Sequence, residues 1–364
     1  WDGYKWQPVG EPYVPYTIIP APTCLPTLPD LRMTVYNLGA DAAKLMAIYP
    51  DLSPAKQQMA YQANNAFDET DATVYGDVYQ WGRVADGHEK RTASVYETTG
   101  ALSDTDLDAT TGQVASTATG KYGHFIKSPS DDYNWYGGTT PDKDNLWGNG
   151  EGLNPQDDNQ GGVLSTSDSK YYQNTNWKIP QNNPCPSGWR VPTQDEWERL
   201  VDYGCGAPQT AGGSLNVSET ENYKSLRDIT STNAPLTWVR VKEGKAFAGT
   251  WINDDRSGYA AYRTDVWDAA IGNNGYFDDS GNPDYTRPLY AAAAPEPLLF
   301  FPVTGYRNRS TGNLSGTGTY GYYWSSTINN ISNSTHSVNF VNEGMTMSTS
   351  YRIHGHSVRC VKSL

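Results

Sequence analysis

The clearest periodic element in the sequence begins at Thr193. Thr193 and Glu196 match a capping box, in which an N-cap hydroxyl and a third-position carboxylate each bind the other residue's backbone N–H. Gly204 stands where a left-handed residue ends a helix. Three apolar residues between them fall on one helix face at i, i+3 and i+4, namely Trp197, Leu200 and Val201. The pattern predicts a helix of about two to three turns.

Short apolar or alternating runs elsewhere predict strands. The continuous apolar run at 298–303 is typical of a central buried strand. In the run at 357–362, the apolar residues Val358 and Cys360 alternate with the charged residue Arg359. A second, short helix is predicted over 56–67. The other predicted strands cover residues 237–241, 246–252, 322–325, 337–341 and 357–362.

Two stretches have little apolar periodicity. Residues 1–29 contain seven prolines and are expected to be extended, polyproline-like or an edge strand, forming an arm or linker before a main domain at 30–364. Residues 103–160 are rich in Asp, Asn, Gly, Ser and Thr, which predicts long loops. We expect four isolated aromatic residues to pin these loops to the body: Tyr122, Phe125, Trp135 and Trp147. The overall pattern is α+β, with small sheets, one or two helices and long irregular loops.

Composition points to an exported domain. Only 18% of the 364 residues are charged, yet mean hydropathy is -0.67, because Asn, Ser, Thr, Gly and Tyr supply the polarity. This balance is typical of a loop-rich extracellular domain, and 12 Trp with 26 Tyr can still build a core. The net charge of -13 argues against nucleic-acid and anionic-membrane partners. No run reaches transmembrane length, and the start at Trp1 suggests a mature or trimmed product.

The four cysteines are Cys24, Cys185, Cys205 and Cys360. None forms a CxxC pair, and no histidine stands near them at the spacing of a zinc site. Two disulfides in an oxidising compartment are the leading interpretation, with four buried free thiols as the alternative.

Candidate chemistry is sparse. The sequence lacks the GxSxG, HExxH and P-loop motifs. Cys205 would follow a helix C-terminus, which raises a thiol pKa and disfavours a nucleophile. Adjacent acids such as 131–132 and 254–255, and the oxygen-rich loops 154–158 and 278–284, are typical of solvated surface turns. We therefore expect no catalytic residues, no metal site and no cofactor, and a protein that is not an enzyme.

Several motifs together resemble a known family. The most distinctive is the segment 183–193, Asn-Pro-Cys-Pro-Ser-Gly-Trp-Arg-Val-Pro-Thr, which runs into Glu196 and Trp197. In order along the chain, similar marks stand at 36–40, 74–83, 144–147, 305–307, 321–326 and 357–361. They resemble the Fibrobacter succinogenes major paralogous domain family, found in surface and secreted proteins of gut Bacteroidetes and their relatives. The resemblance covers almost the whole chain.

The resemblance implies a C-type-lectin-like fold related to formylglycine-generating enzymes. In such folds the first and last strands lie close together and irregular loops cover one face. A disulfide between Cys185 and Cys360 is implied, which would leave Cys24 and Cys205 as a second pair. An extracellular or cell-surface location is also implied, with a virion as the alternative.

The C-terminal segment resembles the variable region of retroelement-diversified proteins. In such regions a constant frame alternates with residues that change freely. The implied frame is Trp324, Ser325, Ser326, Phe340, Gly344, Arg352, Gly355, Ser357, Val358, Arg359 and Cys360. The implied ligand-binding residues are Ile328, Asn330, Ile331, Asn333, His336, Thr349, Tyr351, Ile353, His354 and His356. Met345 and Met347 alternate around Thr346, as core residues do, whereas 351–356 shows no clean apolar face and is expected to be exposed.

These features predict an adhesin-like module that recognises a ligand with its C-terminal face. The expected ligand is a cell-surface protein or a glycan, and residues 1–29 could join the module to pilus, surface or virion subunits. One alternative is a phage tail-fibre receptor-binding protein. A second is a carbohydrate-active or formylglycine-generating type of enzyme, which a deep pocket with convergent acids or a free cysteine would favour.

Overall fold

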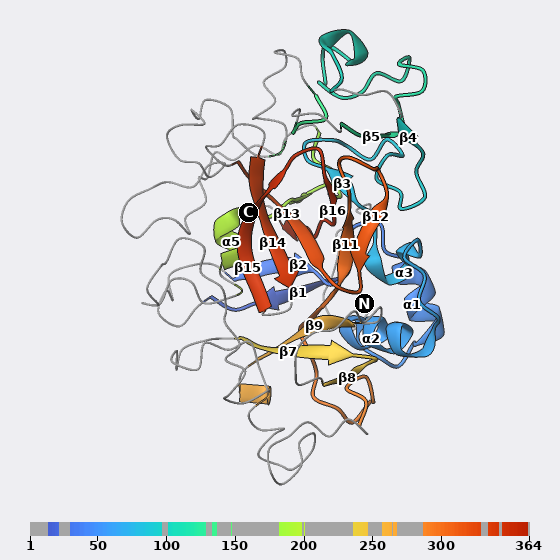
Figure 1. Cartoon of the computed structure of the whole chain (residues 1–364). Helices are drawn as coiled ribbons and strands as arrows, with labels where there is room; N and C mark the ends of the chain where they lie inside the picture. The colour runs from blue at the N-terminus through green and yellow to red at the C-terminus, as the bar shows by residue number, and fades with distance from the viewer. Residues whose placement is uncertain are drawn as a thin grey trace.

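The computed structural model is an α+β fold with several small sheets (Figure 1). The residues that it describes are 14–21, 30–96, 101–128, 133–136, 147, 182–198, 200, 236–246, 257–263, 265–267, 287–328, 334–341 and 344–362. Among these residues, none of the helices has the length and apolar character needed to cross a bilayer.

The helices are short and the strands numerous. The helices are α1 (Ala42–Ile48), α2 (Pro54–Asn64), α3 (Ala72–Tyr75) and α5 (Gln194–Glu198), with a 3-10 turn η1 (Asp104–Asp106). The strands are β1 (Tyr16–Ile19), β2 (Leu31–Thr34), β3 (Tyr79–Gln80), β4 (Val95–Tyr96), β5 (Phe125–Ile126), β6 (Trp189–Arg190), β7 (Leu236–Lys242), β8 (Lys245–Ala246), β9 (Ser257–Arg263), β10 (Leu299–Pro302), β11 (Thr304–Arg307), β12 (Leu314–Thr317), β13 (Gly321–Ile328), β14 (Ser334–Val341), β15 (Gly344–Tyr351), β16 (Gly355–His356) and β17 (Val361–Lys362).

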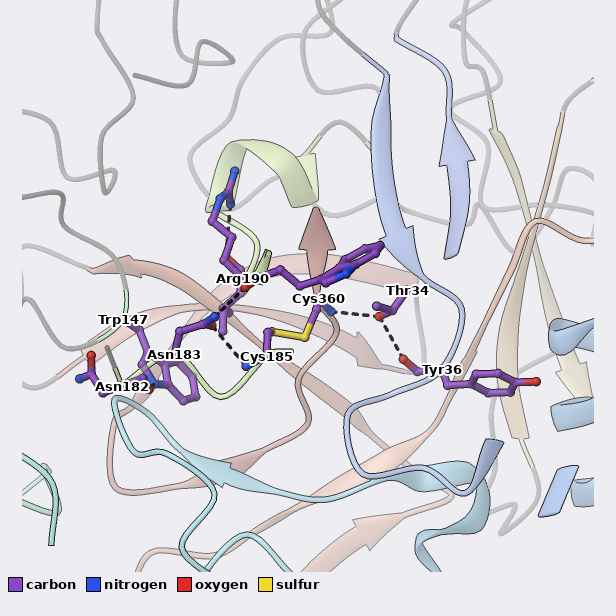
Figure 2. Close-up of a disulfide and its surroundings, with 10 residues drawn as sticks. Thr34, Tyr36, Trp147, Asn182, Asn183, Cys185, Arg190 and Cys360 are labelled. Carbon is purple, nitrogen blue, oxygen red and sulfur yellow. Dashed lines mark hydrogen bonds between the residues drawn. A yellow bond between two sulfur atoms is a disulfide. The ribbon is translucent and has the colours of Figure 1, made fainter. Parts of the chain in front are cut away.

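One sheet joins the two ends of the described chain. Its order is β1-β2-β17-β6, and all of its pairs are antiparallel. Figure 2 shows the disulfide that locks this sheet, between Cys185 and Cys360, as the family resemblance implied. Thr34 on β2 supports it, because its Oγ accepts a hydrogen bond from the Cys360 amide at 3.1 Å and donates one to the carbonyl of Tyr36 at 3.1 Å. Cys24 and Cys205 lie outside the described residues.

The largest sheet has the order β15-β14-β13-β11-β16-β3, with β12 added to β11. Successive side chains of a strand point to opposite faces, so the paired residues of β13 and β14 form two sets, one on each face of the sheet. Tyr323 opposite Val338 faces a first core cluster that includes Phe340. Trp324 faces a second cluster that includes the Cys185–Cys360 disulfide. The sheet therefore divides two aromatic cores.

A third core cluster lies under α2. This helix packs on β9 and β10, with Met59 fully buried against that sheet. The sheet order is β10-β9-β7-β8. The run predicted at 298–303 does form the buried strand β10, but β10 ends the sheet instead of standing at its centre.

The predicted capping box is confirmed. The Glu196 amide donates to Thr193 Oγ at 3.2 Å, and the Thr193 amide donates to Glu196 Oε2 at 2.9 Å. Glu196 also forms a buried, two-point ion pair with Arg190, with N–O distances of 2.7 and 2.8 Å. The described part of this helix is α5, Gln194–Glu198, which agrees with the predicted start. The predicted terminus at Gly204 lies outside the described residues.

Several element predictions need correction. Four α-helices are described instead of one or two, and the helix predicted at 56–67 spans Pro54–Asn64. The strand predicted at 357–362 is shorter, since β17 covers only Val361–Lys362, and Arg359 does not face outward. Its guanidinium is fully buried and donates to Asn37 Oδ1 at 2.7 Å and to the Phe300 carbonyl at 2.8 Å, so it ties three segments together.

The loop predictions are confirmed where the structure describes them. Residues 101–128 form turns, η1 and isolated bridges, apart from the two-residue strand β5. Phe125, Trp135 and Trp147 are buried and pin these loops, but Tyr122 is 44% exposed and does not. In the proline-rich stretch, β1 is an edge strand on β2, which is one of the forms expected there.

Candidate functional site

A groove of about 390 Å³ lies over the β13–β14–β15 region, beside β11 and β16. Figure 1 shows these strands gathered together in the orange and red C-terminal part of the chain. The described residues that line the groove are three tyrosines, two histidines, two serines and a threonine: Tyr306, Tyr322, Ser334, Thr349, Ser350, Tyr351, His354 and His356. None of them carries a carboxylate, an amine, a guanidinium or an aliphatic side chain. Its volume falls within the roughly 300–1,000 Å³ of typical ligand sites.

The alternation of β13 explains one wall of the groove. Tyr323 faces the first core cluster, so its neighbour Tyr322 points to the opposite side, into the groove. Tyr306 on β11 meets the Tyr322 ring edge-on, at 5.0 Å between centroids and 68° between planes. Partial burial raises the pKa of Tyr322 to about 12, so its hydroxyl keeps its proton. The rings of Tyr306 and Tyr322 are therefore steeply inclined to each other in this wall of the groove.

A series of nearly parallel rings forms the other wall. Tyr351 stacks on Tyr133 at 4.0 Å, and His356 stacks on the buried Trp324 at 3.9 Å. His354 stands between these pairs, 6.2 Å from Tyr351 and 6.0 Å from His356, with interplanar angles of 21° and 24°. The series runs from the second core cluster to the surface, which holds the groove wall rigid.

His354 presents a hydrogen-bonding edge to the groove. The Arg309 amide can only donate, and it reaches His354 Nδ1 at 3.3 Å. The Arg307 carbonyl lies 3.4 Å from the same atom and would need the opposite tautomer. We assign Nδ1 as the acceptor, because the amide contact is shorter, which leaves the proton on Nε2. Burial lowers the pKa of His354 to about 4, so the ring is neutral at physiological pH.

Ser350 and His356 are close, but their surroundings do not suit nucleophilic catalysis. Ser350 Oγ lies 3.2 Å from His356 Nε2. A serine nucleophile needs a basic histidine, oriented by a third group at its other nitrogen. Burial lowers the pKa of His356 well below its ordinary value, and within the described part of the chain its Nδ1 has no hydrogen-bond partner. His356 is therefore too weak a base, and lacks the orienting partner, to activate the Ser350 hydroxyl as a nucleophile.

The structure places the predicted site residues in different environments. Thr349 and Tyr351 are exposed and line the groove, as does the half-buried His354. His336 is half-buried on β14 outside the groove lining, and burial lowers its pKa to about 4. Of the remaining predicted residues, Asn330, Ile331 and Asn333, together with the Ile328 side chain, lie outside the described residues.

The expected exposure of residues 351–356 is wrong at four positions, because Arg352, Ile353, Gly355 and His356 are all buried. Ile353 is fully buried in the second core cluster, and its backbone holds the Gln80 side chain at 2.8 Å. His356 is 1% exposed, because its ring stacks on Trp324. The chain turns inward at Ile353 and His356, so only one edge of His356 reaches the groove. Met347 is partly buried against the first cluster, as the alternation predicted, and the Met345 side chain is outside the described set.

The predicted frame residues are buried wherever the structure describes them. Each is at most 1% exposed, apart from Gly355, which is also buried: Trp324, Ser325, Ser326, Phe340, Arg352, Ser357, Val358, Arg359 and Cys360. Arg352 is an example of a buried frame residue that packs on the core, since its guanidinium lies 4.8 Å from the Trp81 ring centroid. Gly344 belongs to β15, but its burial is not among the described features.

A second cluster of titratable groups serves the fold. Asp86, His88 and Glu89 lie close enough to suggest a metal site. Both ring nitrogens of His88 are already engaged, however: Nδ1 with Asp86 at 2.6 Å, and Nε2 with the Gln80 amide at 3.1 Å. Burial lowers the pKa of His88 to about 4, and Asp86 also pairs with Arg83. These bonds hold β3 in place and leave no nitrogen for a metal.

Sequence reasoning missed half of the groove lining. Tyr306, Tyr322, Ser334 and Ser350 were not among the predicted ligand-binding residues. A usable signal existed for Tyr322, because two adjacent tyrosines in a strand must face opposite sides, so one of them leaves the core. Tyr133 stacks on Tyr351 from a separate loop, and no local pattern in the sequence indicates that contact.

The comparisons with known proteins give one similarity. Residues 276–361 match the model of a family described as a domain of unknown function (DUF8237). All eight groove residues fall within this matched segment. No curated protein and no solved structure matches the chain.

Proposed function

We propose that this chain is an exported recognition module, adhesin-like in its action, that binds its ligand in the groove over β13–β15. The observation that carries the proposal is the lining itself. Tyrosine, histidine, serine and threonine combine broad contact area with adaptable hydrogen bonds, as in antibody binding sites. Among the eight residues, none is an acid, a cation or a cysteine, so the lining favours binding over catalysis.

The surrounding frame supports the same proposal. A binding site works best when its side chains are held on rigid elements, because less entropy is then lost on association. Here the ring series extends from Trp324 to Tyr351, and the Cys185–Cys360 disulfide braces the same core cluster. A disulfide of this kind also suits an oxidising, extracellular location.

We infer further that the fold is C-type-lectin-like. In support, β2 and β17 from opposite ends of the described chain are neighbours, and the last strand is linked to the segment before α5. An experimental structure whose strand order matches a C-type-lectin domain would support this inference. A different strand connectivity around β13–β17 would overturn it.

The function can be tested by binding to intact cells. We expect the labelled full chain to bind a subset of a bacterial and animal cell panel in flow cytometry. Thr349→Ala with Tyr351→Ala should reduce that binding by about tenfold or more, because a central tyrosine often contributes about 2 kcal/mol. Both side chains are exposed, so the variant should keep the wild-type melting temperature.

Tyr122→Ala is the matched control, since Tyr122 is also an exposed tyrosine but does not line the groove. It should bind cells like the wild type. Equal binding by the wild type and the Thr349–Tyr351 double variant would show that the groove is not the recognition site. The absence of cell binding by the wild type would count against an adhesin-like role.

A further inference from the structure

We propose that the groove ligand is an uncharged saccharide, bound without calcium, with its ring stacked on the tyrosine faces. This inference rests on the proposed recognition function and specifies its chemistry. It follows from three properties of the lining: the orientation of the rings, the density of hydroxyl groups and the lack of charge.

The rings offer faces of the right kind for a sugar. A pyranose has an apolar face of C–H groups whose hydrogens carry partial positive charge, and the negative face of an aromatic ring attracts them. Tyr351 is 37% exposed, and Tyr133 stacks on its ring at 4.0 Å. Tyr306 and Tyr322 provide a second wall, at 68° to each other. A puckered ring can therefore touch aromatic surface on more than one side.

The groups around those rings match the rim of a sugar. Sugar hydroxyls both donate and accept hydrogen bonds, as do the hydroxyls of Thr349, Ser350 and Tyr322. His354 adds an Nε2–H donor, fixed by the bond from the Arg309 amide to Nδ1. A protein ligand would instead bring aliphatic side chains to the centre of its interface, and the eight lining residues include none to receive them.

The lack of charge selects against ionic ligands and against a bridging cation. Among the residues that the structure describes, no Lys, Arg, Asp or Glu lines the groove, and both histidines are neutral. Sialic acid or sulfate groups would therefore lose water without gaining an ion pair. Arg309 lies nearby, but its guanidinium rests over the Tyr133 and Tyr351 rings, at 4.8 and 5.5 Å from their centroids. Calcium requires six to eight oxygen ligands, usually with carboxylates, and the eight described lining residues include no carboxylate.

An array experiment tests the proposal directly. The labelled full chain is applied to one slide that carries neutral glycans, their sialylated and sulfated counterparts, and unglycosylated extracellular proteins. We expect binding to a subset of the neutral glycans, unchanged by EDTA. Tyr351→Ala should reduce the affinity for the bound glycan at least tenfold in titration calorimetry. Tyr351→Phe, which keeps the ring, should lose less than threefold.

His354→Ala should weaken the same glycan, and His354→Gln, which keeps a donor, should restore part of the affinity. Melting temperatures of all variants establish that they are folded, and Tyr122→Ala again serves as the control. Binding only to charged glycans, or loss of binding in EDTA, would overturn the proposal. Binding only to unglycosylated proteins, still abolished by Tyr351→Ala, would overturn the saccharide inference and leave the recognition function standing. If cell binding also fails to depend on the groove, both proposals fail.

Discussion

Four of the five histidines lie where burial lowers the pKa of the imidazole. The pKa falls to about 4 for His88, His336 and His354, and well below the ordinary value of 6.5 for His356. At physiological pH each of these four histidines is therefore a neutral ring that can still form hydrogen bonds. A charge on His356 would be costly, because in the described structure its Nδ1 has no partner and its ring is covered by Trp324.

These pKa values predict acid sensitivity. As pH falls below 6.5 the unfolded chain takes up protons on these histidines, whereas the folded chain stays neutral until about pH 4. The free energy of unfolding should therefore fall across this window, by up to about 1.4 kcal/mol per pH unit for each histidine. Urea midpoints measured at pH 7.5, 6.5, 5.5 and 4.5 check this.

His356→Phe should keep the stack on Trp324 and make the pH dependence shallower, because it removes one titrating ring. Asp77 works in the opposite direction, since burial raises its pKa to about 6 and its proton uptake favours the folded state as pH falls from 6 to 3.8. A urea midpoint that does not change between pH 7.5 and 4.5 would contradict the dominance of the histidines.

At the scale of elements, the start of α5 combines two kinds of stabilisation in one side chain. Glu196 caps the helix through the Thr193 amide and neutralises Arg190, and both members of the ion pair are buried. Removing one partner of a buried pair leaves a charge without a counter-ion. Both partners come from adjacent segments, so the contacts at this helix start are local in the sequence.

We expect Glu196→Ala to lower the free energy of unfolding by about 3–5 kcal/mol, because Arg190 would stay buried without its partner. Thr193→Ala removes only the cap hydroxyl and should cost about 1 kcal/mol. Urea denaturation of the two variants measures the difference. Equal losses would mean that the ion pair contributes nothing beyond the cap.

The difference between local and distant contacts explains which features could be predicted from the sequence. The capping box and the apolar run at 298–303 are local, so each was visible in a few residues. Helix α1 was not predicted, because only Leu45 is buried while Met46 and Ile48 are 39% and 45% exposed, which leaves no periodic apolar face. Its one local signal is Asp41, whose carboxylate caps the Lys44 amide at 2.9 Å.

The groove was predictable only in part. Tyr351 and His354 could be placed from the lack of an apolar face in 351–356, and Thr349 from the resemblance to a variable region. The burial of Ile353 and His356 depends on partners more than 200 residues away in sequence or on another strand, such as Gln80 and Trp324. No local periodicity encodes those contacts.

At the scale of the whole molecule, one covalent bond spans nearly half of the sequence. Cys185 and Cys360 are 175 residues apart, and linking them restricts the unfolded chain much more than the folded one. The bond lies where β6, β17 and the second core cluster meet. Its main contribution is therefore to global stability.

Replacing both Cys185 and Cys360 by Ala should lower the free energy of unfolding by about 2–5 kcal/mol. Equilibrium urea unfolding measures the loss, and a loss within experimental error would contradict the prediction. Adding a reducing agent to this double variant then probes Cys24 and Cys205. A further downward shift of the midpoint would support their pairing, and no shift would argue against it.

The sheet β1-β2-β17-β6 also determines how the module would respond to tension. β1 and β17 both run antiparallel to the β2 strand between them, so they run parallel to each other. A force applied at Val14 and Lys362 would pull along the strands in opposite directions and load their hydrogen bonds in shear, all at once instead of one by one. Beyond Val361 the load would reach Cys360 and pass through its sulfur into the segment before α5. Tension between these two ends would thus have a covalent route through the disulfide that bypasses residues 186–359, which include the eight described groove residues.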